Sequence, residues 1–227
     1  SVMATPGFCK MSCAKSRPLR GSSRTVASST KKSTEDLVVS TSGASPLTGD
    51  FNGDGLTDVA GASGGTISVA LSTGRQFLPQ PSAWRTGFGA GQAISSADLS
   101  GDGLTDLVRI RNGEVCYWPN LGYGRFGAKV TMDHAPHFDH PDQFDHKRIR
   151  LADIDGTGTT DIIYLHRDGV RLYFNQSGNS WSASQPLRVF PCVDDLVSII
   201  PTDLLGNGTA CLVWSSPLPG DARRQMR

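Results

Sequence analysis

One eleven-residue string of aspartate and glycine recurs along this chain and constrains its fold more than any other feature. It occupies residues 49–59 (GDFNGDGLTDV), 97–107 (ADLSGDGLTDL) and 152–162 (ADIDGTGTTDI). A fourth copy at 202–212 (TDLLGNGTACL) keeps the first aspartate and two glycines but no other acid. The first aspartates of successive copies are 48, 55 and 50 residues apart. A period of about 50 residues is typical of propellers and other repeat arrays.

The segments between these strings consist of short apolar runs bounded by turn residues. Residues 66–71 place Ile67, Val69 and Leu71 on one face with small residues between them, which is the pattern of a half-buried strand. A hairpin turn of the Asn-Gly kind follows at 111–113. Each unit therefore predicts a strand, the acidic string and three more strands, which together make a four-stranded propeller blade.

The chain is expected to contain two regions. Residues 1–45 are a disordered, basic, Ser/Thr-rich leader, and residues 46–227 form the blades of an all-β, partial β-propeller in which helices play almost no part. The blades cover about 46–93, 94–147, 148–195 and, as a partial blade, 196–227. Closed propellers use 4–8 blades, because closure removes exposed strand edges. We therefore expect a fragment of a longer chain, or closure by assembly with something else.

Charge is distributed unevenly between the two regions. Residues 1–34 contain seven basic residues and no acid: Lys10, Lys15, Arg17, Arg20, Arg24, Lys31 and Lys32. This composition buries too little apolar surface to offset ordering entropy, and an organelle transit peptide is the alternative interpretation. The remaining residues carry a net charge of −6. Nucleic acid is therefore not expected as the partner of the repeats.

Cysteine usage and hydropathy exclude several other classes. The five cysteines include one C-x₃-C pair, Cys9 and Cys13, without a second half, so neither zinc nor a disulfide framework is expected. No stretch approaches the ~18 apolar residues of a membrane helix. The N-terminus lacks the apolar region of a secretory signal peptide.

The acidic string defines four nine-residue loops, numbered from the first aspartate: loop 1 (50–58), loop 2 (98–106), loop 3 (153–161) and loop 4 (203–211). Side chains at positions 1, 3, 5 and 9 and the carbonyl of position 7 are predicted to converge on calcium, because it prefers hard oxygen ligands and glycines let the backbone fold tightly. The predicted ligands are Asp50, Asn52, Asp54, Leu56 and Asp58; Asp98, Ser100, Asp102, Leu104 and Asp106; and Asp153, Asp155, Thr157, Thr159 and Asp161.

Loop 4 has Leu205 and Cys211 where ligands belong and is expected to be free of metal. An EF-hand is excluded, since its position-12 glutamate would fall on Gly61, Arg109 and Tyr164 and its flanking helices are missing. A plainer interpretation is that aspartate and glycine simply make good turns. Because the sites repeat and none is unique, the predicted role of the calcium is structural and not catalytic.

Two further segments were considered as functional sites. Residues 61–65 fit G-x-S-x-G, but a nucleophile elbow needs a following helix, so a hairpin turn is predicted. Residues 133–146 contain His134, His137, His140 and His146 among four aspartates. A transition-metal site, a pH-sensitive contact and a solvated insertion are the three interpretations of this segment.

The repeats resemble a known family. The D-x-N-G-D-G-L-T-D loops resemble the FG-GAP/VCBS repeats of integrin-like propellers. Residues 150–161 (RLADIDGTGTTD), 168–179 (DGVRLYFNQSGN) and 203–220 (DLLGNGTACLVWSSPLPG) are similar to the middle region of insecticidal toxin complex B subunits, the SpvB/TcdB-type proteins. The resemblance covers about 46–227.

The resemblance implies a non-catalytic propeller scaffold of a secreted toxin, cytoplasmic before its release. In that family the propeller docks on a pore-forming A-type subunit and helps to enclose the toxic polypeptide of a cargo-bearing C-type subunit. The alternative is a free-standing, calcium-stabilised FG-GAP adhesion or lectin-like module. An enzyme is not expected, since no constellation supplies a nucleophile, a base and an orienting group together.

Overall fold

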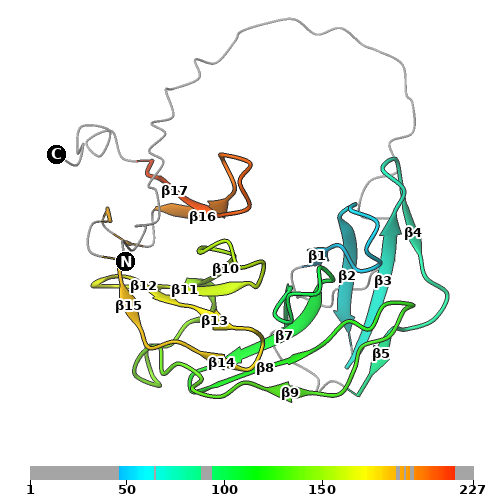
Figure 1. Cartoon of the computed structure of the whole chain (residues 1–227), viewed down its shortest axis with the longest axis horizontal. Coiled ribbons are helices and arrows are strands. Elements are labelled where there is room, and N and C mark those ends of the chain that lie inside the picture. The colour runs from blue at the N-terminus through cyan, green and yellow to red at the C-terminus, as the bar shows by residue number, and fades with distance from the viewer. Residues whose placement is uncertain are drawn as a thin grey trace, which may run out of the picture.

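The computed structural model describes residues 46–63, 65–87, 94–187, 190–191, 193–194 and 197–217, and the predicted leader lies outside these ranges. The described part is almost entirely β-structure (Figure 1). Its one helical element is a single 3₁₀ turn, η2 (His146–Arg148). The all-β fold class predicted from the sequence is therefore confirmed.

Blade 1 is an antiparallel sheet whose strands follow one another in chain order. It consists of β1 (Leu47–Gly49), β2 (Asp58–Ser63), β3 (Thr66–Ser72), β4 (Phe77–Pro79) and the short β5 (Arg85–Thr86), which also pairs with β3. Ser63 pairs with Thr66 across the β2–β3 hairpin. The G-x-S-x-G pattern therefore lies at a strand-to-strand connection, as predicted.

Blade 2 has the same topology, with β6 (Ser95–Ala97), β7 (Asp106–Arg111), β8 (Glu114–Trp118) and β9 (Val130–Thr131). The sequence placed its last strand at 125–127, which is wrong. There the chain forms a compact turn, in which Leu121 donates to the Arg125 carbonyl and Arg125 donates to the Gly122 carbonyl. The outer strand of the blade is β9.

Blade 3 contains β10 (Ile149–Ala152), β11 (Asp161–His166), β12 (Gly169–Tyr173) and β15 (Gln185–Pro186). The predicted last strand at 180–181 exists as β14 (Ser180–Trp181), but it pairs with β13 (Asn175–Gln176) in a separate hairpin. This hairpin inserts Trp181, which is only 2% exposed, into the core shared with blade 2. Blade 4 is described as two strands, β16 (Ser198–Thr202) and β17 (Cys211–Ser215).

The cores lie between neighbouring blades and not within one sheet. Leu107 packs into the cluster shared with blade 1, whereas its neighbour Val108 packs into the cluster shared with blade 3. Ile162 and Ile163 likewise face blades 2 and 4, respectively. Since successive strand residues point to opposite faces, a blade with a neighbour on each side is apolar throughout. This explains why every residue of β11 is buried.

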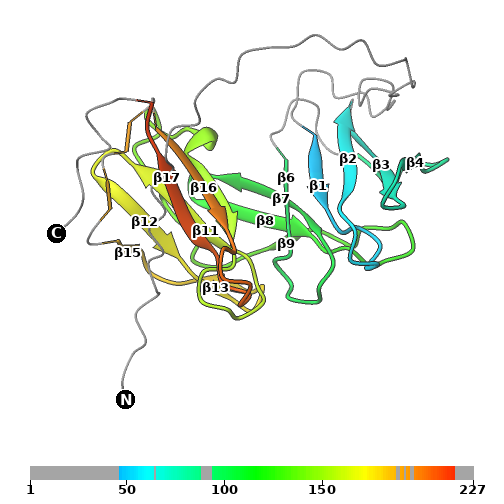
Figure 2. The ribbon, with the colours of Figure 1, turned by 90° about the horizontal axis from the view of Figure 1, so that it is seen from above.

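The four sheets follow one another around an arc, and the described strands do not close it into a ring (Figure 1). The first strand of each blade lies on the inner side of the arc, where β1 packs beside β6 and β10 beside β16. The four acidic loops line one side of the blades (Figure 2). The structure is thus a partial β-propeller.

Candidate metal centre: the acidic loops

All four loops share one backbone frame. The position-1 aspartate accepts a hydrogen bond on Oδ1 from the position-4 glycine at 2.6–2.7 Å, and one on Oδ2 from the position-6 glycine at 2.8 Å. Both glycines have positive φ in every loop, a conformation that glycine adopts without steric cost. These two bonds wrap the loop around its first carboxylate.

Loop 4 separates the residues that make this turn from those that do not. It keeps Asp203 and both glycines, and its frame is the same, although Leu205, Asn207 and Cys211 replace polar or acidic residues. The hydrogen bonds from Gly208, opposed by a small burial effect and joined by those from Gly206, lower the pKa of Asp203. The turn-making interpretation therefore accounts for position 1 only. The other acids of loops 1–3 are not needed for the turn.

The position-9 aspartates begin the second strand of each blade and are completely buried. Asp58 accepts from the amides of Phe51 at 2.9 Å and Ser72 at 2.7 Å. Asp161 accepts from those of Ile154 and Asn175 at 2.9 and 2.8 Å. These carboxylates tie the loop to the end of the third strand. The sequence expected the second strands of blades 1 and 2 to start two residues too early, because positions 7 and 8 still belong to the loop.

Asp106 makes the same connection in loop 2. It accepts on Oδ2 from Leu99 and Ser100 and on Oδ1 from Asn120. Burial raises its pKa to about 6, against the hydrogen bonds from these three amides. Burial likewise raises the pKa of Asp161 to about 6. Both carboxylates thus lose more hydration than their amide partners replace, which is a cost that a nearby cation reduces.

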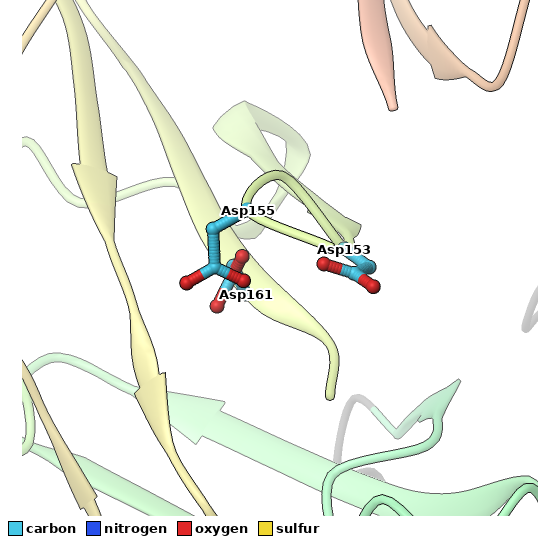
Figure 3. A group of neighbouring side chains, drawn as sticks. All are labelled: Asp153, Asp155 and Asp161. Carbon is cyan, nitrogen blue, oxygen red and sulfur yellow. The ribbon is translucent and has the colours of Figure 1, made fainter. Parts of the chain in front are cut away.

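Loop 3 brings three carboxylates together. One oxygen each of Asp153, Asp155 and Asp161 lies within 4.8 Å of the other two (Figure 3). Figure 3 shows Asp153 and Asp155 on the loop and Asp161 at the start of β11, next to Asp155. The charges of Asp155 and Asp153 add to the raised pKa of Asp161. Three hard oxygen donors with unbalanced negative charge fit calcium, because a carboxylate oxygen that accepts one amide retains a second lone pair.

The remaining predicted ligands are less closely gathered. In loop 1 the Asn52 amide donates to Asp54 at 3.0 Å, while Leu56 points outward and is 38% exposed. In loop 2 the Ser100 hydroxyl reaches Asp98 at 3.4 Å. In loop 3 the Thr157 and Thr159 hydroxyls contact each other at 3.0 Å. Among the described residues, only loop 3 gathers three acidic groups in this way, and calcium at all three loops remains a prediction.

Successive loops are hydrogen-bonded to one another. The position-8 amide of each loop donates to the position-1 carbonyl of the preceding loop: Thr105 to Asp50 at 2.9 Å, Thr160 to Asp98 at 2.8 Å and Ala210 to Asp153 at 2.7 Å. The position-7 side chain meanwhile covers the position-4 glycine of the preceding loop. The row of loops is therefore part of the joint between blades.

Two asparagines reinforce this joint, and sequence reasoning missed them. Asn120 is 1% exposed and donates from Nδ2 to the carbonyls of Phe51 and Thr105 at 2.9 and 3.2 Å. Asn175 does the same with Leu99 and Thr160 at 3.0 and 3.2 Å. Each asparagine lies fourteen residues after the position-9 aspartate. That repeated spacing was the signal that could have found them.

The histidine-rich segment 133–146 is not a solvated insertion, because Phe138 is completely buried against Phe144, Tyr164 and Tyr173. Its backbone is held by Asn112 of blade 2, whose amide group bonds both the Phe138 amide and the Asp139 carbonyl at 2.7 Å. Within the described ranges, its histidines form no group that could hold a metal. The segment packs blade 2 against blade 3.

Residues 50–109 match the FG-GAP-like repeat family model. This stretch covers loops 1 and 2 and the strands between them, so the predicted repeat class is confirmed. No curated protein matches the chain. The part of the chain that the structure describes contains no helix able to span a bilayer.

Solved toxin structures show the same arrangement of blades. The chain is 30% identical to a chain of the Photorhabdus luminescens Tc holotoxin pore, over 72% of its own length, with a TM-score of 0.58. It is 28% identical to TcdB2-TccC3-Cdc42 over 74% of its length, with a TM-score of 0.54. The resemblance to toxin-complex B subunits is thus confirmed. The chain spans 8% of the length of either toxin chain.

A lectin from Agrocybe aegerita, described as recognising non-reducing terminal N-acetylglucosamine, shares the fold alone. The identity is 21%, the match covers 75% of this chain and 46% of the lectin, and the TM-score is 0.58.

Proposed function

We propose that this chain is a non-catalytic propeller scaffold of a secreted toxin-complex B-type subunit, which docks on a pore-forming partner and helps to enclose a toxic polypeptide. The observation that carries the proposal is the 28–30% identity with Tc toxin chains over about three quarters of the sequence. A shared fold alone would favour the lectin equally, but the sequence identity favours the toxin. Partners of the A-type and the C-type follow from this assignment.

A structural role fits the way in which the polar groups are used. The buried aspartates and asparagines bond backbone groups of their own or the adjacent blade. No described residue combines a nucleophile with a base and an orienting group in one cleft, which supports a scaffold more than an enzyme. An activity screen on the purified full chain addresses this point directly.

Calcium in loops 1–3 is the second part of the proposal. The side chains of Asp153, Asp155 and Asp161 would hold the ion in loop 3, and the ion would offset the charge of three close carboxylates. An ion that binds only the folded chain raises its melting temperature, by an amount set by RT ln(1 + [L]/Kd). A melting temperature that is the same in chelator and in millimolar calcium would contradict this part alone.

The assembly role is tested in the source organism. A tag on the natural gene, followed by native purification and mass spectrometry, is expected to recover a chain longer than 227 residues together with a pore-forming subunit and a cargo-bearing subunit. Recovery of a 227-residue chain that binds a glycan and lacks these subunits would instead establish the adhesion or lectin-like module.

A further inference from the structure

The joints between blades contain a repeated knob and hole. The hole is the position-4 glycine of one loop, and the knob is the position-7 side chain of the next. A Cβ atom placed on Gly53, Gly101 or Gly156 would lie 2.9–3.0 Å from Leu104, Thr159 or Thr209, respectively. The position-6 glycines have no such neighbour in any of the four loops, with open space beside all of them. The contact is therefore specific to position 4.

One hole and one knob are left over at opposite ends of the arc. Around Gly206 in loop 4, no described heavy atom lies within 4 Å of the point that a Cβ would occupy. At the other end, Leu56 occupies position 7 of loop 1 and is 38% exposed, whereas the equivalent Thr159 is 7% exposed. Within the described residues, the backbone bond of the joint is likewise not made by the Thr57 amide or by the Asp203 carbonyl.

The two end blades also carry most of the exposed apolar surface. Five of the seven large hydrophobic side chains that are exposed in the described part belong to them: Leu56 and Leu78 in blade 1, and Ile200, Leu204 and Leu205 in blade 4. Between the inner blades, the corresponding surfaces are buried in the shared cores. Exposed apolar patches at sheet faces indicate interaction surfaces.

We propose that the outer face of blade 4 binds blade 1 of a second copy of this chain, head to tail, with Leu56 covering Gly206 and the Thr57 amide donating to the Asp203 carbonyl. The contact continues an interface that the chain already forms three times. Ser72 stands where blades 2 and 3 have Asn120 and Asn175, so the joint between copies lacks the asparagine bonds and is weaker than the internal ones.

A head-to-tail contact is heterologous, so it extends until geometry closes it. The proposal concerns the 227-residue chain and does not depend on the toxin assignment. Sedimentation of the full chain over an approximately hundredfold range of concentration is expected to show monomers giving way to larger species. A chain that stays monomeric throughout would overturn the proposal and leave the toxin-complex function untouched.

Two variants each remove one end of the contact. Leu56→Asp places a charge on the knob, and Gly206→Ala fills the hole. Each is expected to sediment as a monomer on its own. Matched controls are Leu121→Asp, at a more exposed leucine away from both ends, and Gly208→Ala, at the other positive-φ glycine of loop 4. Both controls are expected to associate as the unmodified chain does.

The decisive experiment mixes the two variants. The Leu56→Asp chain retains an intact hole and the Gly206→Ala chain retains an intact knob, so together they form one joint and no second. A one-to-one heterodimer that grows no further is the expected result. Homodimers of either variant alone would mean a symmetric interface and would overturn the head-to-tail arrangement. A mixture that remains monomeric would overturn it as well.

Discussion

Asn120 donates a hydrogen bond to the carbonyl oxygen of Phe51, a residue of the preceding blade 69 positions earlier in the chain. The same amide group reaches the Thr105 carbonyl of its own blade, and its Oδ1 accepts from Gly122. One buried side chain therefore connects two blades and shapes the turn that follows. Its contribution can be measured separately from the apolar core.

Asn120→Ala is expected to lower the free energy of unfolding by about 1–3 kcal/mol, because it leaves buried carbonyls without a partner. Urea unfolding of the full chain measures this change. Asn179→Ala is the control, since Asn179 bonds only an exposed carbonyl, that of Ser177. Equal stability of the two variants would show that the joint does not depend on the asparagine.

Gly101→Ala and Gly103→Ala separate backbone strain from contact between blades. Both glycines have positive φ, 78° and 85°, so both variants carry the cost of that conformation. Only at Gly101 would the new Cβ meet Thr159 of the next blade, at 2.9 Å. Gly101→Ala is therefore expected to be the less stable variant, and Thr159→Ser is expected to restore part of the difference in a double-mutant cycle.

Phe138→Ala tests whether the histidine-rich segment packs blades 2 and 3 together. Removing a completely buried phenylalanine typically costs about 3–5 kcal/mol. Tyr123→Ala is the matched control, since Tyr123 is 97% exposed, and its stability is expected to remain within about 0.5 kcal/mol of the unmodified chain. A small effect at Phe138 would return the segment to the status of a surface insertion.

The buried aspartates predict an unusual pH dependence in the absence of metal. Burial raises the pKa of Asp106 and Asp161 from 3.8 to about 6 in the folded chain. Between these values the folded state binds more protons than the unfolded state, so the stability contribution falls as pH rises from about 4 to 6. The shift corresponds to a loss on the order of 3 kcal/mol per group.

This pH effect is measured in chelator as the difference between the unmodified chain and the Asp106→Asn/Asp161→Asn variant. The difference is expected to change between pH 4 and pH 6 and to be constant above pH 7. Asp102→Asn, at an exposed position of loop 2, serves as the control. A difference that does not vary with pH in this window would show that the two carboxylates titrate normally.

Calcium binding at loop 3 predicts a different result for Asp155. In chelator, Asp155→Asn is expected to be nearly neutral, because the side chain is exposed and bonds only the nearby Thr157 amide. In millimolar calcium the variant is expected to lose most of the stabilisation contributed by loop 3, as shown by a smaller rise in melting temperature. Asn207→Asp in loop 4, which lacks the other acids, is expected to gain none.

The repeat strings and the alternation of apolar residues were sufficient to predict the blades, the loops and most of the strands. The final strands of blades 2 and 3 were placed wrongly, because the turn after Asn120 and the hairpin that buries Trp181 depend on contacts with other blades. Asn120 and Asn175 were missed for the same reason, since their partners are remote in sequence. Phe138 was read as part of a polar segment, although its burial depends on Tyr164 and Tyr173 of the next blade.

Ile162 and Ile163 are consecutive residues that belong to two different cores. Deleting one residue within β11 would exchange the faces of every later side chain in the strand. Each core would then receive the side chains shaped for the other, even though hydrophobicity and strand length would hardly change. In such a chain, length can vary safely by a whole blade or within a turn, whereas a single-residue change in an inner strand disturbs both neighbouring interfaces at once.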